Sequence, residues 1–206
     1  MSSVTPVASG FALQRISNVS NHVFTTPTKR IHDGDGLSFF LNSTGYGDLM
    51  TWLLQLNRSV FPIKDATGAI NACRCDRPPP YSQAVQNLRN LVLDLSGLID
   101  QAPPDTGPRR FGNVAFRTWH KLVEDAADGI LKQRLSDVLH QFEGDQSVQL
   151  SEELKVYLLG SLGSAQRLDY GTGHELCFLA FLGCLWKLDA FAEGEESAIV
   201  LGVVQP

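Results

Sequence analysis

The feature that most constrains the fold is an apolar run at residues 176–186, Leu-Cys-Phe-Leu-Ala-Phe-Leu-Gly-Cys-Leu-Trp, which follows directly on a glycine-rich turn. The run carries no charged side chain, so a helix over it has no polar face to turn toward water. It is also too short to cross a bilayer, which takes about 20 apolar residues. We therefore expect a helix over residues 174–188, buried on all sides among other helices.

The turn before this run has the pattern of a helix N-terminus that can hold an anion. Its sequence at residues 167–175 is Arg-Leu-Asp-Tyr-Gly-Thr-Gly-His-Glu. Thr172 as N-cap and Glu175 three residues later predict a capping box. The unpaired amides and the positive end of the helix dipole, with Gly173 beside them, would admit an anion that Arg167 could clamp. Most capping boxes bind no ligand, and the turn is neither a P-loop nor a dinucleotide fingerprint, so alone it is a weak signal.

Apolar residues recur with the helical period through most of the remaining chain, and no alternating strand pattern is found. The stripes predict amphipathic helices, and the chain is expected to be an all-α single domain over residues 21–206. Residues 1–20 lack periodicity and are expected to be a disordered lead-in. Residues 61–80 are polar, end in three prolines and are expected to form a surface loop. The stripes are Leu49, Trp52, Leu53, Leu56 and Val60; Tyr81, Val85, Leu88, Leu91, Val92, Leu95, Leu98 and Ile99; Phe111, Ala115, Trp119, Leu122 and Ala126; Leu131, Leu135, Val138, Leu139 and Phe142; and Leu150, Leu154, Tyr157 and Leu158.

The charge and the cysteine positions argue against nucleic-acid binding, secretion and a zinc site. The net charge of −5 and the lack of a basic stripe argue against nucleic acid as a partner. The start of the chain has no secretory pattern, so we expect a reducing compartment, the cytoplasm and also the nucleus. Cys73 and Cys75 should be exposed in the 61–80 loop, whereas Cys177 and Cys184 should pack as small hydrophobes. His174 and Cys177 have helical ligand spacing, but the further ligands of a zinc site are missing, and no metal site is predicted.

Four blocks of sequence, in order, resemble the phosphotyrosyl phosphatase activator family. They are His-Val-Phe-Thr-Thr-Pro-Thr-Lys-Arg-Ile at 22–31, Gly-Tyr-Gly-Asp-Leu at 45–49 with Leu-Asn at 56–57, Arg-Phe-Gly-Asn-Val-Ala-Phe-Arg-Thr-Trp at 110–119, and the turn at 167–175. The resemblance runs over about residues 22–200. Because four separate blocks match in the right order, it is far more specific than the turn alone.

The resemblance implies an all-helical fold with a core and a lid, and a function in activating protein phosphatase 2A. Members of the family are also described as peptidyl-prolyl cis-trans isomerases that act on a proline-containing segment of the phosphatase catalytic subunit with the help of ATP-Mg. The family's nucleotide contacts carry over to Arg167, Thr172 and Gly173, in agreement with the anion site expected from the residues. Asp169 and His174 are the polar groups expected to line the catalytic groove, although Asp169 could instead anchor the turn and His174 finish the cap.

One departure from the family pattern leaves a second reading open. Family members continue beyond the point where this chain ends, and the further residues are expected to complete the pocket and supply the magnesium ligands. The alternative function is therefore a non-enzymatic phosphatase-binding module without nucleotide chemistry. We also expect an apolar patch near Phe178, Phe181, Leu185 and residues 198–204, which would favour self-association. Arg117 is expected to be a solvated surface arginine, and Trp119 a core residue.

Overall fold

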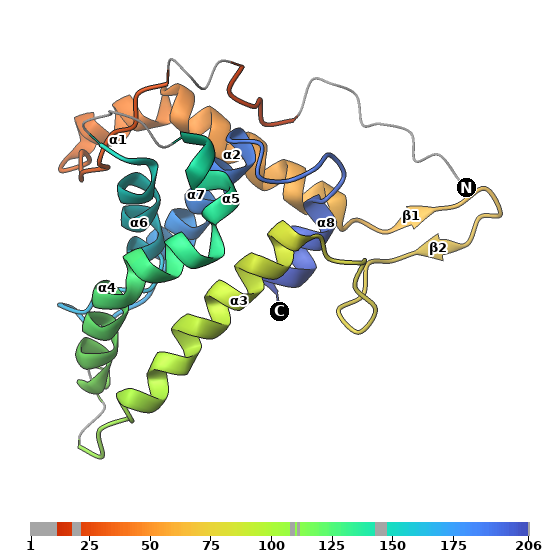
Figure 1. Ribbon diagram of the computed structural model, residues 1–206. Coiled ribbons are helices and arrows are strands. Elements are labelled where there is room, and N and C mark those ends of the chain that lie inside the picture. Colours follow the sequence, from red (N-terminus) through yellow and green to blue (C-terminus); the bar gives the residue numbers. More distant parts are fainter. Residues whose placement is uncertain (1–11, 18–21, 108–109, 111, 143–147, 206) are drawn as a thin grey trace.

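The computed structural model describes residues 12–17, 22–107, 110, 112–142 and 148–205, and the regular secondary structure in this part of the chain is helical apart from one small hairpin (Figure 1). The expected all-α class is confirmed. None of the helices in these ranges is long and apolar enough to span a membrane. The elements are α1 Gly34–Leu41, α2 Thr44–Ser59, β1 Ile63–Lys64, β2 Ile70–Asn71, α3 Gln83–Gly97 with the short helix Leu98–Gln101, α4 Ala115–Arg134, α5 Ser136–Leu139 with the short helix His140–Phe142, α6 Leu150–Gly160, α7 Thr172–Lys187, and α8 Glu196–Ile199 followed by a π-helical turn, η4, at Val200–Val204.

Helix α7 lies in the middle of the molecule, with α6 and α2 packed against it. Its C-terminal half is mostly buried, with Phe181, Leu182 and Leu185 at 0% exposure. Its N-terminal half is not, because Thr172, Gly173, Glu175 and Leu176 are exposed. The expectation that this helix is buried along its whole length is therefore wrong for its first turn, which is the end that carries the predicted anion site.

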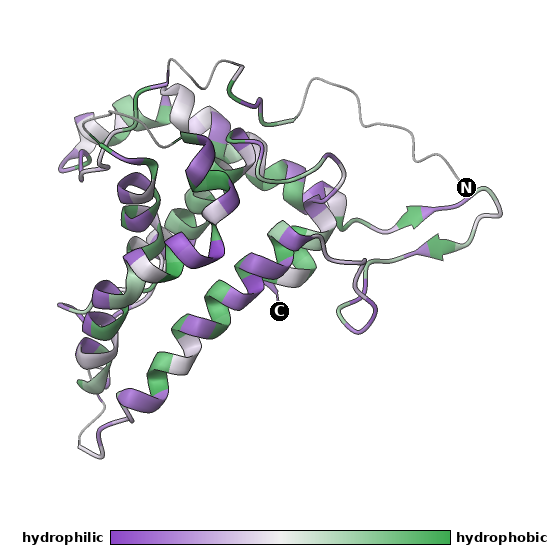
Figure 2. Ribbon diagram, viewed as in Figure 1, coloured by the Kyte–Doolittle hydropathy of each residue, from purple (hydrophilic) through white to green (hydrophobic). Residues whose placement is uncertain are grey.

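The other helices pack by the apolar stripes that their sequences show. On α3 the buried residues are Val85, Leu88, Leu91 and Leu95, as expected. On α4 they are Val123, Ala127 and Leu131, one position later along the helix than the predicted Leu122 and Ala126. Figure 2 shows how hydrophobic and hydrophilic residues alternate along these two helices.

Serine and aspartate residues cap the first three helices. The side chains of Asp33, Ser43 and Ser82 accept hydrogen bonds from the backbone amides of Gly36, Tyr46 and Val85, respectively. The hydroxyl cap expected before α2 is therefore confirmed. On α2 itself Trp52 and Leu56 are buried, but Leu53, expected on the same stripe, is 45% exposed.

Two segments that the sequence treats as irregular have more structure than expected. Residues 61–80 are exposed almost throughout, yet they contain the antiparallel hairpin of β1 and β2, which extends away from the helices (Figure 1). Within the expected lead-in, residues 12–17 pack on the core. Leu13 is 4% exposed, and its carbonyl accepts a hydrogen bond from the Trp186 indole at 2.9 Å. The expected disorder is wrong for that stretch, whereas residues 1–11 and 18–20 lie outside the described residues.

Candidate functional site at the N-terminus of α7

A turn segment at residues 161–171 connects α6 to α7 and carries Arg167 and Asp169, whereas Thr172, Gly173 and His174 lie in the first turn of α7. The Ser164 amide donates to the Asp169 carbonyl at 2.9 Å, and the Leu168 amide donates to the Ser164 carbonyl at 2.7 Å. Leu168 has a φ of 55°, a left-handed conformation that a leucine rarely adopts. The turn therefore has a specific, strained shape rather than that of an open loop.

Arg167 and Asp169 form an ion pair within this turn. Arg167 Nε lies 2.7 Å from Asp169 Oδ2, and the two side chains are 64% and 51% exposed. The hydrogen bond from Arg167 is the main reason that the pKa of Asp169 lies below its usual range, and the same bond raises the pKa of Arg167. Asp169 thus stays charged at neutral pH and occupies one edge of the guanidinium that was predicted to clamp an anion.

The first turn of α7 differs from the predicted capping box. The N-cap is Gly171, in an extended conformation with a φ of −162°, and no side chain caps the helix. Thr172 already belongs to the helix, so its hydroxyl cannot serve as the N-cap, and the expected reciprocal bond with Glu175 does not form. The result is an open helix end. Nothing lies within 4 Å of a Cβ built on Gly171 or Gly173.

His174 is fixed by a neighbour on α6. Its Nδ1 lies 2.6 Å from the carbonyl oxygen of Gly160, and its ring stacks on Tyr170 with 5.5 Å between centroids. Because a carbonyl only accepts hydrogen bonds, Nδ1 must carry the proton, and in the neutral ring Nε2 is left as the acceptor. His174 thus ties the first turn of α7 to the end of α6.

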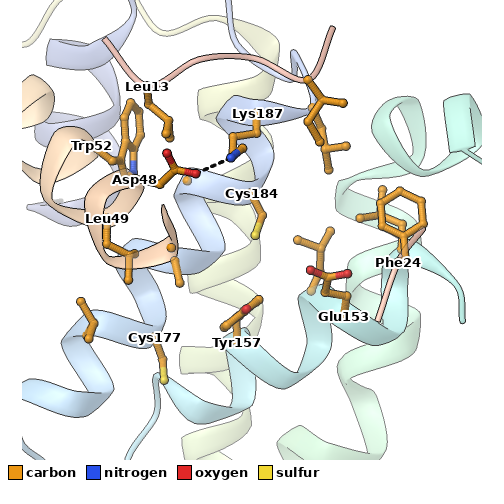
Figure 3. A pocket seen from close by; sticks show the side chains of 18 of the residues that line it. Leu13, Phe24, Asp48, Leu49, Trp52, Glu153, Tyr157, Cys177, Cys184 and Lys187 are labelled. Carbon is orange, nitrogen blue, oxygen red and sulfur yellow. Dashed lines mark hydrogen bonds and ion pairs between the residues drawn. The ribbon is translucent and has the colours of Figure 1, made fainter. Parts of the chain in front are cut away.

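A cavity lies further along α7, as Figure 3 shows. It has a volume of about 440 Å³ and is walled by apolar and aromatic side chains from α2, α6 and α7 and from the N-terminal segment. Asp48 and Lys187 form an ion pair of 2.5 Å at its edge. Burial raises the pKa of Tyr157 and that of Cys184, each to about 12.

None of the predicted site residues lines this cavity. Arg167, Asp169, Thr172, Gly173 and His174 all precede Leu176, the first residue of α7 to reach it. No residue of the cavity has a sequence pattern that marks it as functional. The block at 45–49 contributes Gly45, Asp48 and Leu49 to its wall, so the resemblance did point to that part of the chain.

Metal binding through His174 and the cysteines gains no support. No group of three or more potential ligands occurs among His, Cys, Asp and Glu of the described residues. Cys73 and Cys75 are exposed, as predicted, while Cys177 and Cys184 are half-buried on α7.

The expected apolar patch near the C-terminus is also wrong. Phe181, Leu185 and Ile199 are fully buried, and Val203 is 3% exposed, because η4 packs against α3. Phe178 is half-buried.

Comparisons with known proteins agree with this architecture. The family model described as "Phosphotyrosyl phosphate activator (PTPA) protein" matches residues 27–206. Serine/threonine-protein phosphatase 2A activator 1 of Aspergillus fumigatus is 47% identical over 97% of this chain, and that of Emericella nidulans is 48% identical over 94%. The alignments cover 44% and 46% of those two proteins, so the chain spans less than half of their length.

A solved structure shares the fold. The crystal structure of the PP2A phosphatase activator Ypa1 PTPA1 superposes with a TM-score of 0.77 at 28% identity, covering 94% of this chain and 57% of that one. The family model, the relatives and this structure, together with the helical core around α7, lead to one conclusion. The chain belongs to the phosphotyrosyl phosphatase activator (PTPA) family.

Proposed function

We propose that this protein activates serine/threonine protein phosphatase 2A by acting as a peptidyl-prolyl cis-trans isomerase on a proline-containing segment of the catalytic subunit, assisted by ATP-Mg. The names of the relatives support the phosphatase as target. One structural observation carries the nucleotide part of the proposal. The N-terminus of α7 is open and has no side-chain cap, and an exposed arginine lies in the turn that leads into it.

The residues at this helix end fit a phosphate group. The first amides of an uncapped helix have no intrahelical acceptor, and they lie at the positive end of the dipole. Gly171 and Gly173 leave the backbone accessible, and Thr172 adds an exposed hydroxyl. Arg167, Thr172 and Gly173 would therefore hold the nucleotide phosphates. The described residues offer no cluster of ligands for magnesium, and we assign the ion none of them.

Rotation about an X–Pro bond requires neither a nucleophile nor a metal. The barrier is roughly 18–20 kcal/mol, and a site lowers it by binding the twisted imide more tightly than the planar one. Asp169 and His174 are the polar groups that we propose for the groove. Because Asp169 is paired with Arg167 and His174 with Gly160, each can hold a fixed direction for a hydrogen bond to the substrate.

The test is nucleotide affinity in a matched pair of arginine variants. Arg167→Ala should weaken ATP binding by about 1 kcal/mol or more, since an exposed charged contact lies at the low end of the usual range. Arg74→Ala is the control. Arg74 also pairs with an aspartate two residues later, and at 60% it is about equally exposed, but it lies in the 61–80 loop. Equal ATP affinity of Arg167→Ala and Arg74→Ala, with both folded by circular dichroism, would remove the nucleotide site from the proposal.

A second candidate is the non-enzymatic phosphatase-binding module. The ion pair between Arg167 and Asp169 favours this reading, because the carboxylate competes with an anionic ligand for the guanidinium. This reading expects the chain to bind the phosphatase catalytic subunit equally well with and without ATP-Mg, and to leave the rate of prolyl isomerisation in a peptide unchanged. The isomerase reading expects an ATP-Mg-dependent increase in that rate.

A further inference from the structure

Arg117 on α4 makes hydrogen bonds to two residues that are distant in the sequence. Its Nε donates to the Ala165 carbonyl at 3.0 Å, and its Nη2 donates to the Gln166 carbonyl at 3.3 Å. Both acceptors belong to the turn that carries Arg167 and Asp169. Arg117 is exposed, as expected, but it is more than a solvated arginine, because its guanidinium holds two consecutive carbonyls of that turn.

The segment just before Arg117 supports the same turn. A Cβ built on Gly112 would lie 2.7 Å from Leu168 Cβ and 2.8 Å from the Leu168 carbonyl oxygen, so only glycine fits against that residue. The ring of Phe116 contacts the same turn, with its Cζ atom 3.2 Å from a Cβ built on Gly163. Residues 112–117 thus form a cradle for residues 163–168.

The strain in the turn explains why it needs this cradle. Leu168, at a φ of 55°, adopts a conformation that persists only where the surroundings enforce it. The residues on both sides of Leu168 are the exposed pair Arg167 and Asp169, which cannot enforce it by packing. The two bonds from Arg117 and the contact with Gly112 are the tertiary restraints that can.

We infer that Arg117 is a positioning residue, which holds the turn in the shape that presents Arg167 to a ligand at the N-terminus of α7. The identity of the ligand, ATP, rests on the proposed function, whereas the restraint of the turn by Arg117 does not. A guanidinium can serve two neighbouring carbonyls at once because its N–H groups form a rigid fork, whereas the single ammonium of lysine cannot do so in the same geometry. The two-pronged geometry of the Arg117 guanidinium, more than its charge, is thus what holds the turn.

The experiment compares Arg117→Gln and Arg117→Lys with a control on the same helix, Arg134→Gln. Arg134 also makes two hydrogen bonds, to Asp94 at 2.7 and 3.0 Å, but does not touch the turn. Limited trypsin digestion followed by mass spectrometry measures cleavage after the exposed Arg167, which reports the order of the turn. Calorimetry measures ATP affinity, and thermal unfolding measures global stability.

Both Arg117 variants should be cut after Arg167 about tenfold faster than the wild type and should bind ATP about tenfold more weakly, as expected for the loss of a charged hydrogen bond. Arg134→Gln should leave both quantities within about twofold of the wild type even if it lowers the melting temperature. Wild-type cleavage and wild-type affinity in Arg117→Gln would overturn the inference. If Arg117→Lys alone kept the wild-type cleavage rate and the wild-type ATP affinity, a positive charge at residue 117 would be sufficient, and the positioning role of the guanidinium would be wrong.

The two proposals fail in different ways. If the wild type binds no ATP, the nucleotide site is wrong, and the cleavage rates alone decide whether Arg117 orders the turn. If the wild type binds ATP and Arg167→Ala abolishes binding while Arg117→Gln binds normally, the nucleotide site stands and the positioning role is wrong.

Discussion

At the scale of single residues, the hydrogen-bond and ion-pair partners of the side chains in the turn before α7 determine what each side chain can bind. The sequence identifies Arg167, Asp169 and His174 as the polar groups of the site, and all three lie in or next to the turn. It does not reveal that Arg167 and Asp169 pair with each other, because that contact depends on the bend at Leu168. Nor does it reveal the role of Arg117, whose acceptors lie 48 and 49 residues away. Long-range pairing is the information that local patterns lack.

The pairing leads to a prediction for Asp169. An anionic ligand has to compete with this carboxylate for the Arg167 guanidinium, so Asp169→Asn should strengthen the binding of magnesium-free ATP. An exposed ion pair is worth at most about 1 kcal/mol, which corresponds to an increase of up to about fivefold. Calorimetry on wild type and variant measures the change. If Asp169 also acts on the substrate, the same variant should lose prolyl isomerisation while gaining ATP affinity, and a fall in both would show that the carboxylate assists nucleotide binding.

A second residue-scale prediction concerns alkaline pH. Burial raises the pKa of Tyr157 from 10.0 and that of Cys184 from 9.0, each to about 12. Since the unfolded chain loses these protons at lower pH than the folded chain does, stability is complete below about pH 9 and falls as the pH rises toward 12. Tyr157→Phe should reduce that fall by about 1–2 kcal/mol, after allowance for the half-exposed ring. Urea unfolding at about pH 8 and about pH 11 measures it, and an unchanged pH dependence in the variant would contradict the assignment.

At the scale of elements, the helices on which hydrophobic residues recur every three to four positions are well predicted. Their periodicity follows from packing on one side, which is why the buried face of α3 is right in all four residues. On α4 the buried residues Val123, Ala127 and Leu131 are spaced by four, and Trp119, four residues before Val123, donates its indole N–H to the Leu95 carbonyl at 3.1 Å. The hairpin at β1 and β2 escapes prediction because its strands of two residues each are too short to show an alternation.

The helix caps predict different stability losses for two substitutions to alanine. Ser82 accepts from the Val85 amide at the start of α3, so Ser82→Ala should destabilise the protein by about 1 kcal/mol. Thr172, by contrast, lies inside α7, so Thr172→Ala should have almost no effect on stability, contrary to the capping box expected from sequence. Both variants are compared with wild type by urea unfolding. A loss in Thr172→Ala equal to that in Ser82→Ala would restore the threonine as a cap.

At the scale of the whole molecule, we expect from the sequence an exposed apolar surface near the C-terminus, but the structure has it on α1 and α2. Helix α1 has no buried residue, and on the adjacent α2 the side chains of Met50, Leu53 and Leu54 are 36%, 45% and 47% exposed. Phe39 on α1 is 80% exposed. The sequence could not place this surface, because a helix with apolar residues on two faces does not reveal which face the core covers.

This surface predicts that the chain self-associates. Contiguous apolar surface on a soluble protein promotes association, and Met50, Leu53 and Leu54 fall on one side of α2. Sedimentation at micromolar concentration should therefore show species larger than the monomer, and Leu54→Lys should shift the population toward the monomer and lower the binding of a hydrophobic dye. The control is Leu93→Lys, since Leu93 is 62% exposed but lies on α3. A wild type that sediments as a single monomeric species, or a Leu93→Lys variant with the same effect as Leu54→Lys, would show that α2 is not the interface.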